Sequence, residues 1–508
     1  MSPIGKSSLS YEGERSLTTA LAQNLDNLNK EWRLAMDQSR TPLFSLLDTF
    51  VRNHSTSFHV PGHKNGEIFA EFASSYFKQI LKLDVTELPG LDDLHAPTGA
   101  IREAEQLASE FFKSDHTFFL VGGSTVGNLA MIMACVQPGD KVIVQRNSHK
   151  SIMHGLELSG ARPVFIAPEF NQDVGRFTSP SYQTVVSAVR KHSDAKAVIL
   201  TYPDYFGRTY EIKKMIDFIH QYHIPILVDE AHGVHFSLGE PFPVSSLQLG
   251  ADIVVQSAHK TAPAMTQSSY LHINSGFHLK DKVAYYLQML QSSSPSYPLM
   301  ASLDIARSYL ATRTYQDIEE IISSVLKVRK LLEQCKGFEV LPLTSKDDLL
   351  KITLHVKPSY SIQQIISGLE EFHIYPELTT DRQILLIHGL APFGQLSQLE
   401  KAVKRINEQL KKDIIHATID VSKLFPEPIS ELALTYQEMN QLTYTNVALD
   451  QGLGNIAAES IIPYPPGIPL ILKGERMTEI QAMTVNHLLK QGVNIQQRTK
   501  GIKIYSTE

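Results

Sequence analysis

Short apolar runs alternate with amphipathic stretches through the middle of the chain. The runs are rich in β-branched residues and mostly apolar throughout, as expected of strands that are covered on both faces. Six of them lie at 116–121, 141–145, 161–167, 196–202, 224–229 and 251–256, and a seventh at 268–274. Helix-like spacing separates several runs, for example at 124–136 and 211–223. This alternation predicts an α/β fold in which a mainly parallel sheet carries helices on both sides.

The pattern changes after residue 279. Helical spacing fills 279–336, and two strand-like runs at 349–356 and 382–390 then alternate with helix-like stretches. This change predicts a second, smaller α+β domain at the C-terminal side. We therefore expect an N-terminal, partly helical segment with motifs of the site entrance, a large ligand-binding domain and a small C-terminal domain. Their expected bounds are 1–115, 116–313 and 314–508.

Composition and charge narrow the class of protein. Hydrophobic residues make up 43% of the 508 positions and charged residues 20%, as in ordinary globular proteins. A net charge of −6 without a long basic run argues against a nucleic-acid partner. The two cysteines lie far apart and suggest neither a disulfide framework nor a zinc site. We find no apolar signal core and no run of about 18 apolar residues, so we expect a cytoplasmic protein that binds no membrane.

Four polar motifs follow predicted strands, and ligands of open parallel sheets bind beyond the carboxyl ends of such strands. The first motif, GGSTVGN at 122–128, lies between a strand and a helix. Its glycines would let the backbone approach an anion, and the amides of Ser124 and Thr125 at a helix N-terminus would favour a phosphate. The motif lacks the GKS/T of a P-loop, and an ordinary serine-capped helix start has the same pattern.

The second and third motifs offer an imidazole and a carboxylate. His149 in RNSHKS would either cap the following helix or stack on a flat ring. Asp229 in ILVDEAHG would either cap a turn or pair with a protonated heterocyclic nitrogen, because a carboxylate at the end of a buried strand needs a partner. We expect the neighbouring Glu230 to turn outward, while Ala231 is small enough for a ring to lie against it.

The fourth motif, SAHKTAPAMTQ at 257–267, supplies Ser257, His259 and Lys260 within four residues. A lysine in a partly desolvated pocket has a lowered pKa and can form a Schiff base, whereas a lone lysine is more often a surface residue. Together the motifs place a phosphate cradle, a stacking ring, a carboxylate and an amine at the strand ends of one sheet. These are the groups needed to hold pyridoxal 5'-phosphate.

The order of these motifs resembles the fold-type I pyridoxal-phosphate enzymes, and more narrowly the bacterial ornithine/lysine/arginine decarboxylase family. Further matching segments are FHVPGHKNG (58–66), LDDLHAPTGAIREAE (91–105), SSSPSYPLM (292–300) and PYPPGIPL (463–470). The resemblance extends over about residues 41–475. It is to the shorter branch of the family, which lacks an N-terminal receiver-like domain.

The resemblance implies a role for each candidate residue. Lys260 would hold the cofactor as a Schiff base, Asp229 would pair with the ring nitrogen, and His149 would stack on the ring. Lys260 or His149 would return a proton to Cα after CO2 leaves. The cofactor phosphate would be bound by Ser124, Thr125, Ser257 and His259 and, from a neighbouring subunit, by Ser293 or Ser294. The site would then require a homodimer or a higher homo-oligomer.

The implied substrate is a basic amino acid. Glu377 in YPELTT is the candidate partner for its distal cation, although a solvated loop carboxylate is the alternative. The expected reaction is decarboxylation of arginine to agmatine first, then of lysine to cadaverine or ornithine to putrescine, feeding polyamine synthesis. We expect no metal, because the Pro-Gly between His59 and His63 breaks any shared helical face.

Two other functions remain open at this point. The chain could be another fold-type I enzyme, such as an aminotransferase or an aldol-type lyase, although we identify no arginine that would clamp the α-carboxylate of an aminotransferase substrate. It could also be a non-catalytic regulatory paralogue. Such a protein would be expected to lose the Schiff-base lysine or the ring aspartate, and both Lys260 and Asp229 are present.

Overall fold

The fold comes from a computed structural model of the chain. It describes residues 36–274, 279–412, 422, 424–463, 467–490, 494–495 and 501–506. Residues 1–35 of the N-terminal segment that we expected to be partly helical lie outside the described residues. Within them, none of the helices combines the length and the hydropathy that a membrane span requires.

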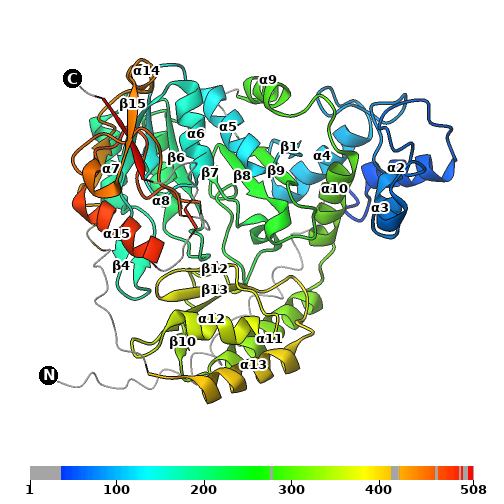
Figure 1. Ribbon diagram of the computed structural model, residues 1–508. Helices are drawn as coiled ribbons and strands as arrows, with labels where there is room; N and C mark the ends of the chain where they lie inside the picture. Colours follow the sequence, from blue (N-terminus) through cyan, green and yellow to red (C-terminus); the bar gives the residue numbers. More distant parts are fainter. Residues whose placement is uncertain are drawn as a thin grey trace.

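An eight-stranded sheet forms the centre of the large domain, with the strand order β1-β9-β8-β7-β6-β2-β3-β14 (Figure 1). Its strands are β1 (His116–Leu120), β2 (Lys141–Gln145), β3 (Arg162–Ile166), β6 (Ala197–Thr201), β7 (Ile226–Asp229), β8 (Ile253–Ser257), β9 (Ser269–Ile273) and β14 (Ile429–Glu431). The five strands from β8 to β3 run parallel, and β1, β9 and β14 pair antiparallel. The prediction of a mainly parallel sheet is confirmed, with antiparallel strands at both ends.

Helices cover both faces of this sheet, which explains why its strands are apolar throughout. In β2, Val142 and Val144 belong to one buried cluster and Ile143 to the other. The first cluster includes side chains of α5 (Gly123–Cys135), α6 (Lys150–Ser159) and α9 (Lys280–Leu290). The second includes side chains of α4 (Ala100–Phe112), α7 (Tyr182–Lys191), α8 (Ile212–His220) and α10 (Tyr297–Ala311).

The small domain lies below the large one in Figure 1. The long helix α11 (Tyr315–Leu332) leads into it, and its antiparallel sheet has the order β10-β11-β13-β12. The elements are β10 (Phe338–Val340), β11 (Lys351–Val356), α12 (Ile362–Glu370), β12 (Leu378–Thr379), β13 (Gln383–Ile387) and α13 (Leu396–Gln409). The predicted change to an α+β pattern therefore corresponds to a separate sheet.

The C-terminal segment returns to the large sheet, because β14 pairs with β3. Arg146, which follows β2 and is only 2% exposed, donates to the carbonyl of Pro469 at 2.8 Å and forms an ion pair with Glu475 at 2.8 Å. The region 314–508, expected as one domain, thus contributes strands to three sheets. Its remaining elements are α14 (Tyr436–Met439), β15 (Tyr444–Val447), α15 (Glu479–Lys490) and β16 (Ile502–Tyr505), of which β15 and β16 pair.

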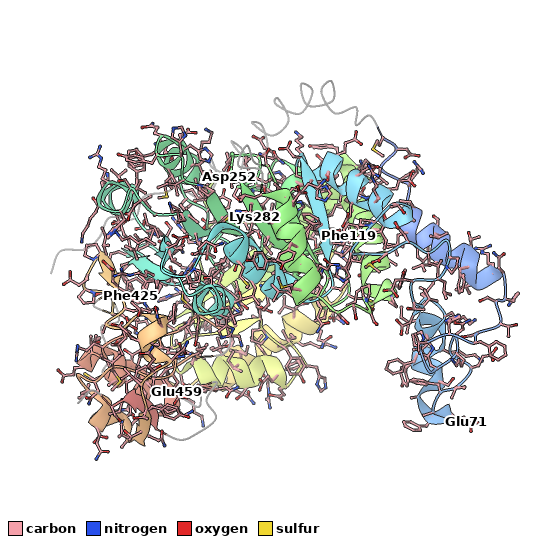
Figure 2. All side chains as sticks on the ribbon, turned by 90° about the horizontal axis from the view of Figure 1, so that it is seen from above. Glu71, Phe119, Asp252, Lys282, Phe425 and Glu459 are labelled. Carbon is pink, nitrogen blue, oxygen red and sulfur yellow. The ribbon has the colours of Figure 1, made fainter. Side chains whose placement is uncertain are left out.

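An arm, defined here as residues 54–82, projects from the large domain beyond α2 (Pro42–Arg52). Figure 2 shows Glu71 near its tip, away from the body of the molecule. The arm contains a short 3-10 turn, η1 (Glu71–Ala73), and the helix α3 (Ser74–Leu81), which buries none of its residues. Its exposed large apolar side chains are those of Phe58, Val60, Ile68, Phe69, Phe72, Tyr76 and Phe77.

Candidate active site

The pairing register brings the loops after β1 and β8 together. Leu120 and Ser257 both lie opposite Ser269 of β9, so the two strand ends share one edge of the sheet. The Ser124 hydroxyl lies 2.6 Å from that of Ser257 and 3.2 Å from that of Ser269. Ser124 belongs to the first turn of α5, where free backbone N–H groups favour an anion. Thr125 follows it and is exposed.

A buried carboxylate stands at the end of β7. Asp229 is 3% exposed, and its Oδ2 accepts a hydrogen bond from Asn128 Nδ2 at 3.0 Å while its Oδ1 accepts one from the Ala231 backbone N–H at 3.2 Å. Burial raises the pKa of Asp229, and the nearby Lys260 ammonium opposes this shift. The carboxylate therefore lies where a further positive partner would stabilise its ionised form.

A hydrogen-bonded chain connects this carboxylate to His149. The second Nδ2 hydrogen of Asn128 is donated to Ser151 Oγ at 2.9 Å, and Ser151 Oγ lies 2.8 Å from His149 Nδ1. His149 is the N-cap of α6, because its Nδ1 also accepts the Ser151 backbone N–H at 3.2 Å. Burial, with the nearby charge of Lys260, lowers the pKa of His149 to about 3. The imidazole is thus neutral near pH 7.

Lys260 ends a short 3-10 turn, η3 (Ala258–Lys260), directly after β8. Its Nζ lies 3.1 Å from His232 Nε2. Burial lowers the pKa of Lys260, while the carboxylates of Asp229 and Glu377 act in the opposite direction. An amine with a lowered pKa in a partly desolvated place is suited to attack a carbonyl carbon.

Glu377 lies at the mouth of this cluster, on the small domain. Its exposed carboxylate accepts a hydrogen bond from the Tyr205 hydroxyl at 2.6 Å. The Tyr205 ring in turn lies 6.0 Å from Lys260 Nζ and 4.6 Å, edge to face, from the His232 ring. An acidic group therefore stands one aromatic side chain away from the reactive lysine.

Several residues that we expected to contact the cofactor have surroundings that differ from those of the clustered side chains described above. The His259 ring contacts the backbone oxygen of Ser268 at 3.0 Å, and Ser293 and Ser294 are exposed between α9 and α10. Their expected roles at the phosphate, and the ring-facing role of Ala231, stay predictions. Residues 464–466 of the PYPPGIPL motif lie outside the described residues.

The expectation that Glu230 turns outward is wrong. Glu230 is fully buried, and its carboxylate accepts hydrogen bonds from Ser245 Oγ and Gln256 Nε2, both at 2.7 Å, and from the hydroxyl and backbone N–H of Ser246. Burial raises the pKa of Glu230 to about 7, although these hydrogen bonds lower it. Since Asp229 and Glu230 are adjacent in an extended strand end, their side chains point in opposite directions.

Five residues of the cluster were not singled out from the sequence. Asn128 and His232 lie inside motifs that were, GGSTVGN and ILVDEAHG, and Ser151 ends RNSHKS. Tyr205 follows β6 and could have been found by the same strand-end rule. Lys351 belongs to β11 of the small domain, and its only sequence signal is a lysine at the start of an apolar strand.

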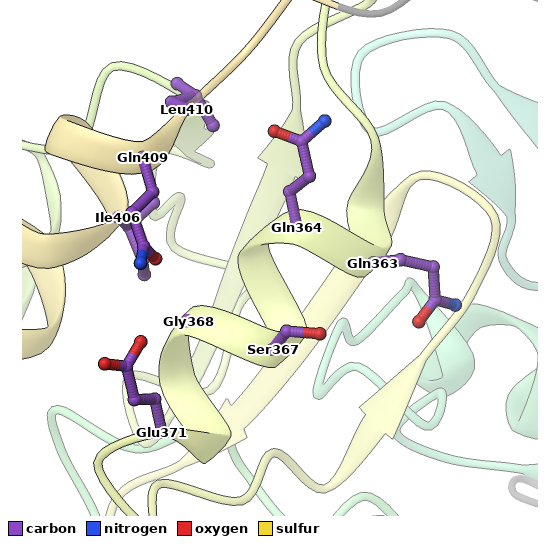
Figure 3. Close-up of a pocket in the computed structure, with 8 residues that line it drawn as sticks. All are labelled: Gln363, Gln364, Ser367, Gly368, Glu371, Ile406, Gln409 and Leu410. Carbon is purple, nitrogen blue, oxygen red and sulfur yellow. The ribbon is translucent and has the colours of Figure 1, made fainter.

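Two surface hollows contain none of these groups. Figure 3 shows the first, of about 340 Å³, between α12 and the end of α13. It is lined by Gln363, Gln364, Ser367, Gly368, Glu371, Ile406, Gln409 and Leu410. The second, of about 270 Å³, lies between α6 and the C-terminal segment. The candidate site is therefore defined by the side-chain cluster at the edge of the large sheet.

The clustered groups fit pyridoxal 5'-phosphate. The Ser124 and Ser257 hydroxyls at a helix N-terminus suit a phosphate, the buried Asp229 carboxylate suits a protonated ring nitrogen, and the Lys260 amine suits an aldehyde. Asn128 Oδ1 is a buried acceptor without a hydrogen-bond partner in the described part of the chain. Fold and site together define a pyridoxal-phosphate enzyme of fold type I.

Comparisons with known proteins identify the family. The model "Orn/Lys/Arg decarboxylase, major domain" matches residues 41–359, and its C-terminal domain model matches 415–502. The Bacillus subtilis (strain 168) protein YaaO is 43% identical over 467 residues, which cover 91% of this chain and 96% of YaaO. Arginine decarboxylase of the same strain is 36% identical, with the same two coverages. The chain belongs to the Orn/Lys/Arg decarboxylase family.

The solved structures agree on the fold. Lysine decarboxylase A from Pseudomonas aeruginosa superposes with a TM-score of 0.78 at 20% identity, covering 97% of this chain and 82% of that one. The expected fold class and cofactor are confirmed. The chain is a pyridoxal-phosphate-dependent carboxy-lyase, which answers the question of whether it is an enzyme.

We expect Asp229→Asn to lower kcat by at least about a hundredfold, because a neutral amide no longer stabilises a protonated ring nitrogen in a buried site. CO2 release under saturating substrate measures this loss. The adjacent Glu230→Gln serves as the matched control, since the Glu230 carboxylate points away from the cluster toward Ser245 and Gln256. A similar loss of kcat in both variants would contradict the assignment of Asp229.

Proposed function

We propose that this carboxy-lyase removes CO2 from a basic amino acid, with arginine as the preferred substrate and lysine or ornithine as the next candidates. The supporting observation is the Glu377 carboxylate, which stands at the mouth of the cluster within electrostatic reach of Lys260. The 36% identity to an arginine decarboxylase supports the order of substrates.

Asp229, Lys260 and His149 have different roles in the proposed reaction. When bound, pyridoxal 5'-phosphate accepts the electron pair that the departing carboxylate leaves behind. Asp229, held by Asn128 and by the Ala231 N–H, would pair with the ring nitrogen and keep it protonated. Lys260 Nζ would hold the cofactor covalently in the substrate-free enzyme and, as a free amine when substrate is bound, would carry the proton that Cα receives after CO2 has left. His149 is neutral and lacks the proton of an imidazolium, so we assign it to the ring face and Lys260 to proton transfer.

Recognition of the substrate's distal cation would fall to Glu377. Its Oε1 is held at 2.6 Å by the Tyr205 hydroxyl, which fixes the direction in which the carboxylate faces. A charge-assisted hydrogen bond from a guanidinium or ammonium group would then orient the substrate relative to Lys260. Arginine, lysine and ornithine differ mainly in length, and a methylene group is worth only about 1–3 kcal/mol in a pocket.

The products of these reactions are amines, and we propose that they feed polyamine synthesis in the cytoplasm. The two unpaired cysteines support this compartment, because cytosolic thiols are kept reduced. Among fold-type I enzymes, an aminotransferase or aldol-type lyase would release no CO2, so the same assay separates these alternatives.

We expect Glu377→Gln to raise the KM for the preferred basic amino acid about 10–100-fold, since a hydrogen bond to a charged group is worth about 1.5–3 kcal/mol. The value of kcat should change little. The measurement is CO2 release from arginine, lysine, ornithine and a neutral amino acid. Glu370→Gln, an exposed carboxylate on α12, is the control. Release from none of the basic amino acids by the unmodified enzyme would overturn the proposed function.

We further propose that the enzyme is a homodimer or a higher homo-oligomer, with Ser293 or Ser294 reaching the cofactor phosphate of the neighbouring subunit. The arm supports this proposal. Phe58, Phe72 and Tyr76 are 94%, 89% and 85% exposed, and such a concentration of apolar side chains marks an interaction surface. In the sequence the arm is followed by the 91–105 motif, whose His95 contacts the Ser292 backbone oxygen at 2.9 Å.

We expect Phe58→Ser combined with Phe72→Ser to shift the enzyme from a dimer toward a monomer at micromolar concentration, because the buried apolar area of the contact is lost. Light scattering coupled to gel filtration measures the mass. The control combines Tyr315→Ser and Leu326→Ser, two exposed apolar residues of α11 that lie outside the arm. A monomeric unmodified enzyme, or a dimer that tolerates the arm changes, contradicts the proposed surface.

A further inference from the structure

Lys351 reaches the active-site cluster from the other domain. It is the first residue of β11, and its side chain is 3% exposed. The Lys351 side chain packs directly against Gly207, which lies in the loop that follows β6. A Cβ on Gly207 would meet Lys351 Cγ and would lie 2.9 Å from Asp348 Cβ, and Gly207 also has a positive φ of 84°. Only glycine allows this approach, so the fold accommodates a buried lysine at this point.

His232 connects the two buried lysines. Its Nε2 lies 3.1 Å from Lys260 Nζ, and its Nδ1 lies 2.9 Å from Lys351 Nζ. The imidazole is 6% exposed, and burial together with the two neighbouring ammonium groups lowers the pKa of His232 well below its usual range. His232 is therefore a neutral imidazole with a lysine at each ring nitrogen.

Hydrogen-bond counting restricts the charge of this triad. A neutral imidazole has one N–H donor and one acceptor nitrogen, and an ammonium group can only donate. Whichever ring nitrogen carries the hydrogen must face a lysine that accepts it, and only an uncharged amine has the lone pair to do so. Both contacts are therefore hydrogen bonds only when at least one of the two lysines is an uncharged amine, so that the pair carries at most one positive charge.

The surrounding charges leave both lysines able to lose the proton. Lys260 is also faced by Asp229, Glu377, Tyr205 and His149. Lys351 is faced by Asp348, Glu377 and Asp204, and His232 by Tyr205 and His235. Burial, opposed by these carboxylates, lowers the pKa of Lys351 to about 8. A proton that moves through His232 exchanges the charged and uncharged lysine without passing through water.

We propose that Lys351, acting through His232, is a positioning residue that gives Lys260 access to its uncharged amine form near neutral pH. That form captures the cofactor: the Nζ lone pair bonds to the aldehyde carbon, and the carbonyl oxygen leaves as water with the two amine protons. The proposal rests on the cofactor chemistry of the proposed function and adds a residue from the small domain to it. No amino-acid substrate takes part in this step.

The test follows cofactor capture by the full-length enzyme after its cofactor has been removed. Pyridoxal 5'-phosphate is added at pH values from about 6 to about 10, and the growth of the visible absorbance band gives the rate. Lys351→Met and Lys351→Gln remove the second charge, so Lys260 retains its proton to higher pH. We expect the midpoint of the rate profile to rise by about one pH unit or more, which is about a tenfold slower capture below the midpoint.

Lys346→Met removes an exposed lysine from the turn before β11 and is the matched control, with an unchanged midpoint expected. In both Lys351 variants, capture should recover at high pH, which a merely structural defect would not produce. Midpoints within about 0.3 units of the unmodified enzyme, or no capture at any pH in both variants, would overturn the proposal. An unmodified enzyme that forms the band but releases no CO2 would instead count against the proposed function alone.

Discussion

The arrangement of the site depends on one constraint, the burial of the Asp229 carboxylate at the end of a central parallel strand. A buried charge must be compensated by hydrogen bonds or by opposite charge. Asn128 supplies the first hydrogen bond and, through Ser151, extends the same network to His149. Lys260, at the end of the adjacent strand β8, supplies positive charge nearby. The side chains that would contact a flat, charged cofactor are therefore held in place by interactions that begin at the Asp229 carboxylate.

Side chains close to Asp229 also connect the two domains. His232 lies three residues after Asp229 and contacts Lys260 on one side and Lys351 of the small domain on the other. Glu377, also from the small domain, accepts a hydrogen bond from the Tyr205 hydroxyl of the large domain. Because these contacts cross between the domains, the protonation of the reactive lysine depends on how the small domain is docked. Gly207 permits this docking by leaving room for the stem of Lys351.

Much of this could be predicted from the sequence, because strand ends of a parallel sheet meet at one edge. The apolar runs predicted the seven large-sheet strands of the region 116–274, and the polar residues at the ends of these strands predicted Ser124, Asp229, Ser257 and Lys260. The burial of Glu230 could not be predicted, since its partners Ser245, Ser246 and Gln256 come from other segments. The pairing of β14 with β3 and the contact of Lys351 with His232 could not be predicted either. Both depend on tertiary packing, which produces no periodic pattern in the local sequence.

Mass spectrometry after borohydride reduction would identify the residue that holds pyridoxal 5'-phosphate covalently, which we assign to Lys260. Reduction fixes the cofactor to the nitrogen that carries it, and a protease digest then locates the added mass. We expect the visible band to disappear on reduction and the added mass to lie on the peptide containing SAHKTAPAMTQ, at Lys260. A cofactor found on Lys351 or on any other lysine, with Lys260 unmodified, would contradict the assignment of Lys260.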